Sequence, residues 1–175
     1  MALALALVAT GAIGLASTWL FGSPVVTSGV GRGQPAPEIA GTTLDGMPFE
    51  LSSLQGRPVI VNFWGPSCVP CRDEFPLFEA KLEQHAGDGL AIVGVLMDDP
   101  VAPARDFAAA YGATWPTVED PNGTLKAAYR VAARPQSYFI DAAGILRQIQ
   151  VGEVTDADFE RLFATIAPSP APSGP

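Results

Sequence analysis

The sequence is poor in the residues that bind metal ions. It contains two cysteines and one histidine among 175 residues, whereas a structural zinc site usually takes four Cys or His ligands. We therefore expect no metal site, although copper(I) held by the two thiolates alone remains open. The histidine, His85, lies in the polar stretch Glu83–Gly87. This setting predicts a surface residue near a helix C-terminus.

Basic residues are also scarce. With 10 Lys and Arg against 18 Asp and Glu, the formal net charge is −8. The chain lacks the clustered Lys and Arg that bind phosphates, so we expect no nucleic-acid partner. We interpret the acidic residues as a solvated surface. Hydrophobic residues make up 48% of the sequence, which is ample for the core of one ordinary domain.

Charge is absent from the N-terminal run Ala2–Gly22. As a helix, this run is just long enough to cross a hydrocarbon core of about 30 Å. It continues beyond Gly14–Ser17, the small residues at which a signal peptide could be cleaved. We therefore favour an uncleaved membrane anchor over residues 1–22, with a cleaved segment and a secreted protein as the alternative. No Lys or Arg precedes the run, so charge leaves its orientation open.

Between the two ends lies one domain, residues 35–167, without internal repeats. Residues 23–34 form a Gly-rich flexible linker, and residues 168–175 a Pro-rich tail that we expect to be disordered. Within the domain we expect a hairpin from 39–44 and 48–51, a helical turn at 52–54, strands at 59–64, 90–96, 136–141 and 145–151, an edge segment at 115–120, and helices at about 69–85, 102–111, 125–129 and 156–166. Thr155 is the expected N-cap of the last helix. This order predicts a mixed three-layer α/β domain.

The two cysteines, Cys68 and Cys71, lie where the apolar run 58–64 passes to a helix. Unpaired backbone N–H groups and the positive end of the helix dipole favour a thiolate there. Such a setting can lower a cysteine pKa from about 8.5 to between roughly 3.5 and 7.5. The pair therefore predicts a redox site. A structural disulfide is the alternative, but so short a loop would constrain the unfolded chain little.

Several motifs between Gln34 and Ile166 resemble the thioredoxin superfamily, in particular the membrane-anchored TlpA/ResA/DsbE (CcmG) type. They are Pro35–Pro37, Leu54–Pro58, Asn62–Gly65, Cys68–Pro76 and Arg134–Asp141. The resemblance implies a thioredoxin-like α/β/α fold with a mixed central sheet and an N-terminal β-hairpin. It also implies that the only redox group is the Cys68–Cys71 disulfide, with no further cofactor.

The resemblance assigns roles to these residues. Cys68 would be the exposed nucleophile that attacks a substrate disulfide, and Cys71, more buried, would resolve the mixed disulfide. Pro135 would be the family's cis-proline, which leaves the main chain of Arg134 free to pair with an extended substrate. A trans proline that starts an edge strand is the alternative. Pro70 would fix the turn at the helix start.

Glu74 is the candidate acid/base. It lies about one helical turn beyond Cys71, so it can face the same cleft. Asn62 stands where thioredoxin has a buried Asp, and an amide cannot accept a proton there. The alternative for Glu74 is an ordinary solvated helix carboxylate.

The remaining candidates belong to the substrate-binding rim. Trp64 is expected either to cover the site or to pack in the core. Ser67 stands where the family commonly has Trp, so we expect it to expose more of Cys68 and to remove an apolar docking surface. We place Val69 and Pro70 in this rim with Arg134 and Pro135.

Together these features predict a membrane-tethered thiol–disulfide oxidoreductase that reduces protein disulfides on the extracytoplasmic side. Apocytochrome c is a candidate substrate, and a membrane dithiol donor would return the electrons, because no reductant pool exists outside the cell. One alternative is a peroxiredoxin-like peroxidase, which needs Thr or Ser where Gly65 stands. The other is a non-enzymatic chaperone that holds copper or an apoprotein through the dithiol.

Overall fold

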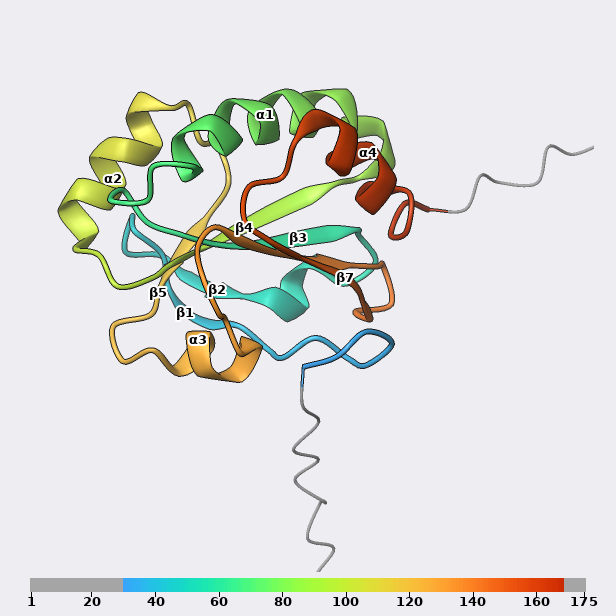
Figure 1. Cartoon of the computed structure of the whole chain (residues 1–175). Helices are drawn as coiled ribbons and strands as arrows, with labels where there is room; N and C mark the ends of the chain where they lie inside the picture. Colours follow the sequence, from blue (N-terminus) through green and yellow to red (C-terminus); the bar gives the residue numbers. More distant parts are fainter. Residues whose placement is uncertain (1–29, 169–175) are drawn as a thin grey trace, which may run out of the picture.

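A computed structural model of the chain describes residues 30–168 (Figure 1). The predicted membrane segment, most of the predicted linker and nearly all of the predicted tail lie outside these residues. Within residues 30–168, no helix is long and apolar enough to cross a membrane.

A mixed sheet of five strands forms the middle layer, as the sequence predicts. In order across the sheet the strands are β5 (Thr117–Glu119), β4 (Ala91–Leu96), β3 (Val59–Trp64), β6 (Gln136–Ile140) and β7 (Leu146–Val151). β3, β4 and β5 are parallel, whereas β6 and β7 are antiparallel to their neighbours. Every residue of β3 and β4 is buried, because other elements cover both faces of the sheet.

Helices cover one face of the sheet, and a helix and the hairpin cover the other (Figure 1). The first face carries α1 (Cys71–Gln84), α2 (Val101–Ala110) and α4 (Asp156–Phe163). The second carries α3 (Thr124–Tyr129) and the hairpin of β1 (Ala40–Thr42) and β2 (Pro48–Glu50). Two 3-10 turns complete the fold, η1 (Leu51–Leu54) and η2 (Ala86–Asp88).

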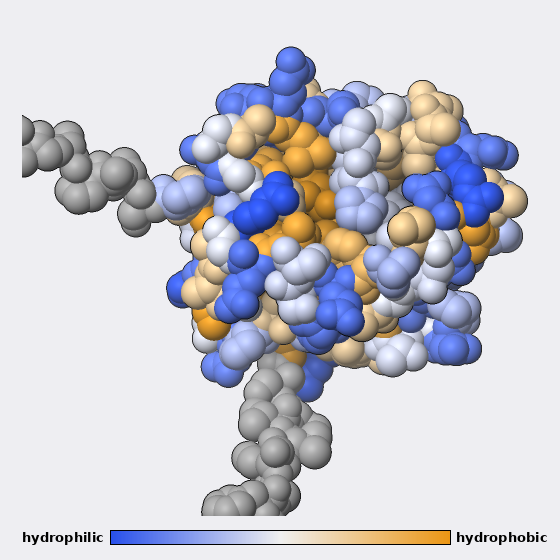
Figure 2. All heavy atoms as spheres, turned by 180° about the vertical axis from the view of Figure 1, so that it is seen from behind, coloured by the Kyte–Doolittle hydropathy of each residue, from blue (hydrophilic) through white to orange (hydrophobic). Residues whose placement is uncertain are grey.

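The two faces of β3 divide the core. Ile60 and Trp64 belong to one cluster with side chains of α1, α2 and α4. Val61 and Phe63 belong to a second cluster on the side of α3 and the hairpin. Alternation along a strand sends neighbouring side chains to opposite faces, so one apolar run supplies both halves of the core. The face turned away in Figure 1 mixes hydrophilic and apolar areas, and a broad apolar area lies among hydrophilic side chains (Figure 2).

The ends of several elements differ slightly from the predictions. Gly33 donates a backbone hydrogen bond to Leu146 (2.8 Å), and Leu146 donates one to Gln34 (2.9 Å). The last residues of the predicted linker are therefore held against β7, and the ordered domain begins before residue 35. Thr155 caps α4 as predicted, since its hydroxyl accepts from the backbone N–H of Asp158 at 3.2 Å.

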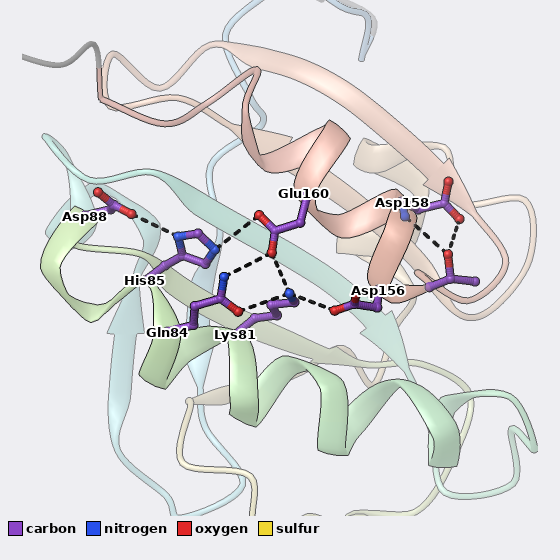
Figure 3. A network of polar contacts seen from close by, with 8 residues as sticks. Lys81, Gln84, His85, Asp88, Asp156, Asp158 and Glu160 are labelled. Atoms are coloured by element: carbon purple, nitrogen blue, oxygen red, sulfur yellow. Dashed lines mark hydrogen bonds and ion pairs between the residues drawn. The ribbon is translucent and has the colours of Figure 1, made fainter.

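A polar network joins α1 to α4 (Figure 3). The buried ammonium of Lys81 contacts Asp156 at 2.8 Å and Glu160 at 2.5 Å. His85 lies at the C-terminus of α1 as predicted, but it is not a surface residue. Its side chain is only 12% exposed, and its ring centroid lies 4.1 Å from that of Phe163. Packing against α4 removes it from solvent.

Candidate active site

Cys68 and Cys71 form a disulfide between the end of β3 and the start of α1. Cys71 is the first residue of α1 and is fully buried, and Pro70 is its N-cap. Cys68 is the more accessible cysteine, as predicted, but only 6% of its surface is exposed. The prediction of an openly exposed Cys68 is therefore wrong for this oxidised state.

The loop before β6 faces this turn. The peptide bond between Arg134 and Pro135 is cis, as predicted. The carbonyl of Pro135 accepts a hydrogen bond from Gly152 at 2.9 Å, which ties the loop to the end of β7. The guanidinium of Arg134 donates to the hydroxyl of Ser67 at 2.8 Å. This bond connects the cis-proline loop to the residue before Cys68.

Ser67 does not leave Cys68 openly exposed, contrary to our expectation. Its hydroxyl donates to Asp99 at 2.9 Å, and Asp99 forms an ion pair with Arg134 at 2.7 Å. Asp99 follows β4, so three loops meet over the cysteine turn. Ser67, Asp99 and Arg134 thus form a polar cluster beside the cysteine turn. Sequence analysis missed Asp99, because nothing in the chain near it indicates this contact.

Glu74 is buried, so the alternative of a solvated carboxylate is wrong. Only 1% of the residue is exposed. Its carboxylate accepts hydrogen bonds from the Asn62 amide at 2.8 Å and from the backbone N–H of Val154 at 2.9 Å. Burial raises the pKa of Glu74 to about 8, although the bonds from Val154 and Asn62 lower it in part. Glu74 thus holds a proton near neutral pH.

Asn62 orients Glu74. It lies on β3 opposite Ser137 of β6, and its amide also donates to the Ser137 hydroxyl at 2.9 Å. Both Asn62 and Ser137 are fully buried. Because an amide stays neutral, this position adds no second charge to the site. Glu74 and Cys71 lie about one turn apart on α1, and both are buried.

Two of the predicted rim residues, Trp64 and Val69, differ from each other in exposure. Trp64 is fully buried, with its ring centroid 4.6 Å from Phe75 and 5.2 Å from Phe107. It supports the core behind the cysteines and cannot contact a substrate, so its placement in the rim is wrong. Val69, between the cysteines, is 66% exposed. It is the apolar surface nearest to Cys68 along the chain.

Comparisons with known proteins agree with this geometry. Residues 32–149 match the AhpC/TSA family. The chain belongs to this family. It is 35% identical over 136 residues to the thioredoxin-like protein YneN of Bacillus subtilis, covering 76% of this chain and 79% of that protein. It is 34% identical over 139 residues to the thiol-disulfide oxidoreductase ResA of Geobacillus kaustophilus, covering 79% and 80%.

The fold is also similar to that of a solved thiol:disulfide interchange protein. A thiol:disulfide interchange protein of the thioredoxin family from Chlorobium tepidum superposes with a TM-score of 0.70 at 30% identity. The match covers 78% of this chain and 98% of that one. With its thioredoxin-like fold, its Cys68–Cys71 disulfide and these relatives, this family member is a thiol–disulfide oxidoreductase, and the predicted fold and enzyme class are confirmed.

The structure weakens the peroxidase alternative further. The Thr or Ser of a peroxiredoxin-like site would have to replace Gly65. A Cβ at that position would collide with the carboxylate of Asp99 and the guanidinium of Arg134. A hydroxyl side chain at position 65 would therefore need the side chains of Asp99 and Arg134 to move.

Proposed function

We propose that this protein reduces disulfides of other proteins on the extracytoplasmic side of a membrane, to which residues 1–22 tether it. The observation that carries the proposal is the pairing of Cys71 with Glu74. Cys71 is fully buried, and the carboxyl one turn along α1 has a pKa of about 8. A buried thiol needs a nearby proton acceptor before it can attack, and a group with a pKa near the working pH suits that task.

The reaction has two exchange steps. The Cys68 thiolate attacks one sulfur of the substrate disulfide, forms a bond to it and releases the other sulfur as a thiolate. Where Glu74 is ionised, Cys71 then gives its proton to that carboxylate and attacks the Cys68 sulfur. The Cys68–Cys71 disulfide forms, and the second substrate thiol leaves. Two electrons pass from the dithiol to the substrate, so a donor must reduce the disulfide again.

The donor and the substrate follow from the location. Outside the cytoplasm no thiol pool supplies electrons, so we assign the donor to a membrane protein with its own dithiol. The uncharged run Ala2–Gly22 keeps the domain close to such a donor. We propose apocytochrome c as a substrate, since its haem-attachment cysteines must be reduced before haem is bound.

The test is a trap in cells that express the full chain. With Cys71→Ser, the mixed disulfide on Cys68 cannot be resolved, so we expect covalent adducts that reducing agents release. Non-reducing electrophoresis and mass spectrometry would identify the partners. The matched control is the double variant Cys68→Ser/Cys71→Ser, which should trap nothing. Absence of adducts with Cys71→Ser, or equal adducts with the control, would reject the proposal.

A further inference from the structure

The guanidinium of Arg134 uses only part of its hydrogen-bonding capacity. Nη1 donates to the backbone carbonyl of Met97 and to Asp99 Oδ2 at 2.7 Å, and Nη2 donates to Ser67 Oγ at 2.8 Å. A guanidinium has five N–H groups, and these contacts occupy three of them. The Nε–H and the second N–H of Nη2 make no hydrogen bond with any residue from 30 to 168.

The two free N–H groups lie on the same edge of the guanidinium. Asp99 Oδ2 accepts from Nη1, Ser67 Oγ accepts from Nη2, and these two oxygens are hydrogen-bonded to each other at 2.9 Å. The two oxygens therefore lie side by side and face the edge of the guanidinium formed by Nη1 and Nη2. The second N–H of Nη1 points to Met97. What remains is the edge formed by Nε and Nη2, whose two N–H groups are parallel. The Arg134 side chain is 23% exposed, so part of it can be reached from solvent.

We propose that this free edge of Arg134 binds a carboxylate of the substrate, from an Asp or Glu side chain close to the substrate cysteine. Two parallel N–H groups match the two oxygens of a carboxylate. Three existing hydrogen bonds already hold the guanidinium, so little conformational entropy is lost on binding. The proposal rests on the proposed function, because it places the carboxylate on the protein whose disulfide Cys68 attacks.

The position of the edge supports this role. Ser67, which Arg134 contacts, is the residue before Cys68, and Arg134 itself precedes the cis-proline. A substrate sulfur in reach of Cys68 therefore places its neighbouring residues beside this guanidinium.

The acidic residues nearby are largely engaged with other groups. They line a groove of about 760 Å³ at the ends of β4 and β5. Asp98 pairs with Lys126 at 2.6 Å, and Asp120 accepts from the backbone N–H groups of Leu125 and Lys126. Asp99 balances the single positive charge of Arg134 but contacts only the Nη1 end of the guanidinium, so the free edge still presents two donors.

The test compares matched peptide disulfides with the full-length reduced protein in a non-ionic detergent. Each peptide has blocked termini and one cysteine in a mixed disulfide with a coloured aromatic thiol. Each pair differs only by Asp or Asn, one or two residues before or after the cysteine. Cys68 attacks the peptide sulfur and releases the coloured thiolate, whose absorbance gives the second-order rate constant. At one of these positions we expect Asp to react about fivefold to tenfold faster than Asn.

Variants assign the preference to Arg134. Arg134→Gln should bring the Asp/Asn ratio to 1 or below, because Asp99 is then unpaired. Arg134→Gln/Asp99→Asn should bring it close to 1. The matched control is Arg72→Gln on α1, an exposed residue that loses the same charge near the site and should keep the ratio.

Two results would overturn the inference. One is a ratio below about twofold at every position in the unaltered protein, since a bound carboxylate must favour Asp. The other is an equal fall in the ratio with Arg72→Gln and Arg134→Gln, which would indicate general charge attraction. Failure of the Asn peptides to react at all would instead reject the proposed function, so the two failures are distinguishable.

Discussion

Burial changes the acid–base behaviour of Glu74, because two hydrogen bonds replace only part of the hydration that a charged carboxylate needs. The neutral neighbour Asn62 donates a bond without adding charge. A single carboxyl therefore holds one exchangeable proton beside Cys71. A carboxyl at position 62 would titrate together with Glu74, and the two pKa values would depend on each other. The Asn62 amide does not titrate, so Glu74 is the one carboxyl of this pair that does.

The first prediction at this scale concerns Glu74→Gln. In the unaltered protein, attack by Cys71 should become faster as the pH rises through about 8, where Glu74 becomes able to accept the thiol proton. The variant should lack this inflection and be about tenfold slower or more at pH 7. Stopped-flow decay of a preformed mixed disulfide on Cys68 measures the step.

A matched control separates proton transfer from helix charge. Glu83→Gln removes a carboxylate from an exposed position of the same helix, and its pH–rate profile should match that of the unaltered protein. An identical profile for Glu74→Gln would show that Glu74 takes no part in the exchange.

Single residues also mark where sequence reasoning fails. The cysteine pair, the cis-proline and Glu74 could be found from local motifs, because each lies at a fixed place in its own segment. The contact of Ser67 with Asp99 could not, since 32 positions separate them. Side chains from distant segments meet only after the sheet has formed.

At the scale of elements, the joint between α1 and α4 depends on one buried cation. Lys81 is 5% exposed, and 79 positions separate it from Glu160. Its ammonium also lies 5.3 Å from the centre of the Phe159 ring. The two nearby carboxylates raise the pKa of Lys81. Along α1 alone the residue looks like an ordinary exposed helix charge, and only the docking of α4 buries it.

We expect Lys81→Met to weaken this joint. Methionine keeps much of the apolar stem but loses both ion pairs, so the free energy of unfolding should fall by about 2 kcal/mol. The control is Lys126→Met, which removes the more exposed pair with Asp98 and should cost less than about 1 kcal/mol. Urea unfolding measures both. Equal losses would mean that burial gives the Lys81 pairs no added strength.

At the scale of the whole molecule, the order of the elements was the most predictable property. Apolar strands and amphipathic helices carry their own periodicity, so each named element formed within a few residues of its predicted range. Helix ends were less certain, since they depend on contacts outside the helix: α1 starts at Cys71 rather than 69, and α4 ends at Phe163 rather than 166. The burial of Trp64 likewise depends on tertiary packing, because Phe75 of α1 and Phe107 of α2 pack against its ring.

The last prediction concerns the stability of the whole domain against pH. The pKa of Glu74 is about 8 in the folded protein and 4.5 as an ordinary glutamate. Between these values the folded state keeps a proton that the unfolded state releases. Its contribution to stability is therefore complete below about pH 4.5 and is lost as the pH rises through about 8.

Glu74→Gln provides the reference, because glutamine does not titrate. From pH 5 to pH 8.5, the free energy of unfolding of the oxidised protein should fall relative to that of the variant by on the order of 4 kcal/mol. Other shifted groups act outside this window: the pKa of Glu160 is lowered, and burial raises the pKa of Tyr138 to about 12. Urea unfolding across the range measures the difference. Parallel curves for the two proteins would mean that folding does not raise the pKa of Glu74, and the pH dependence of Cys71 attack would then not be centred near pH 8.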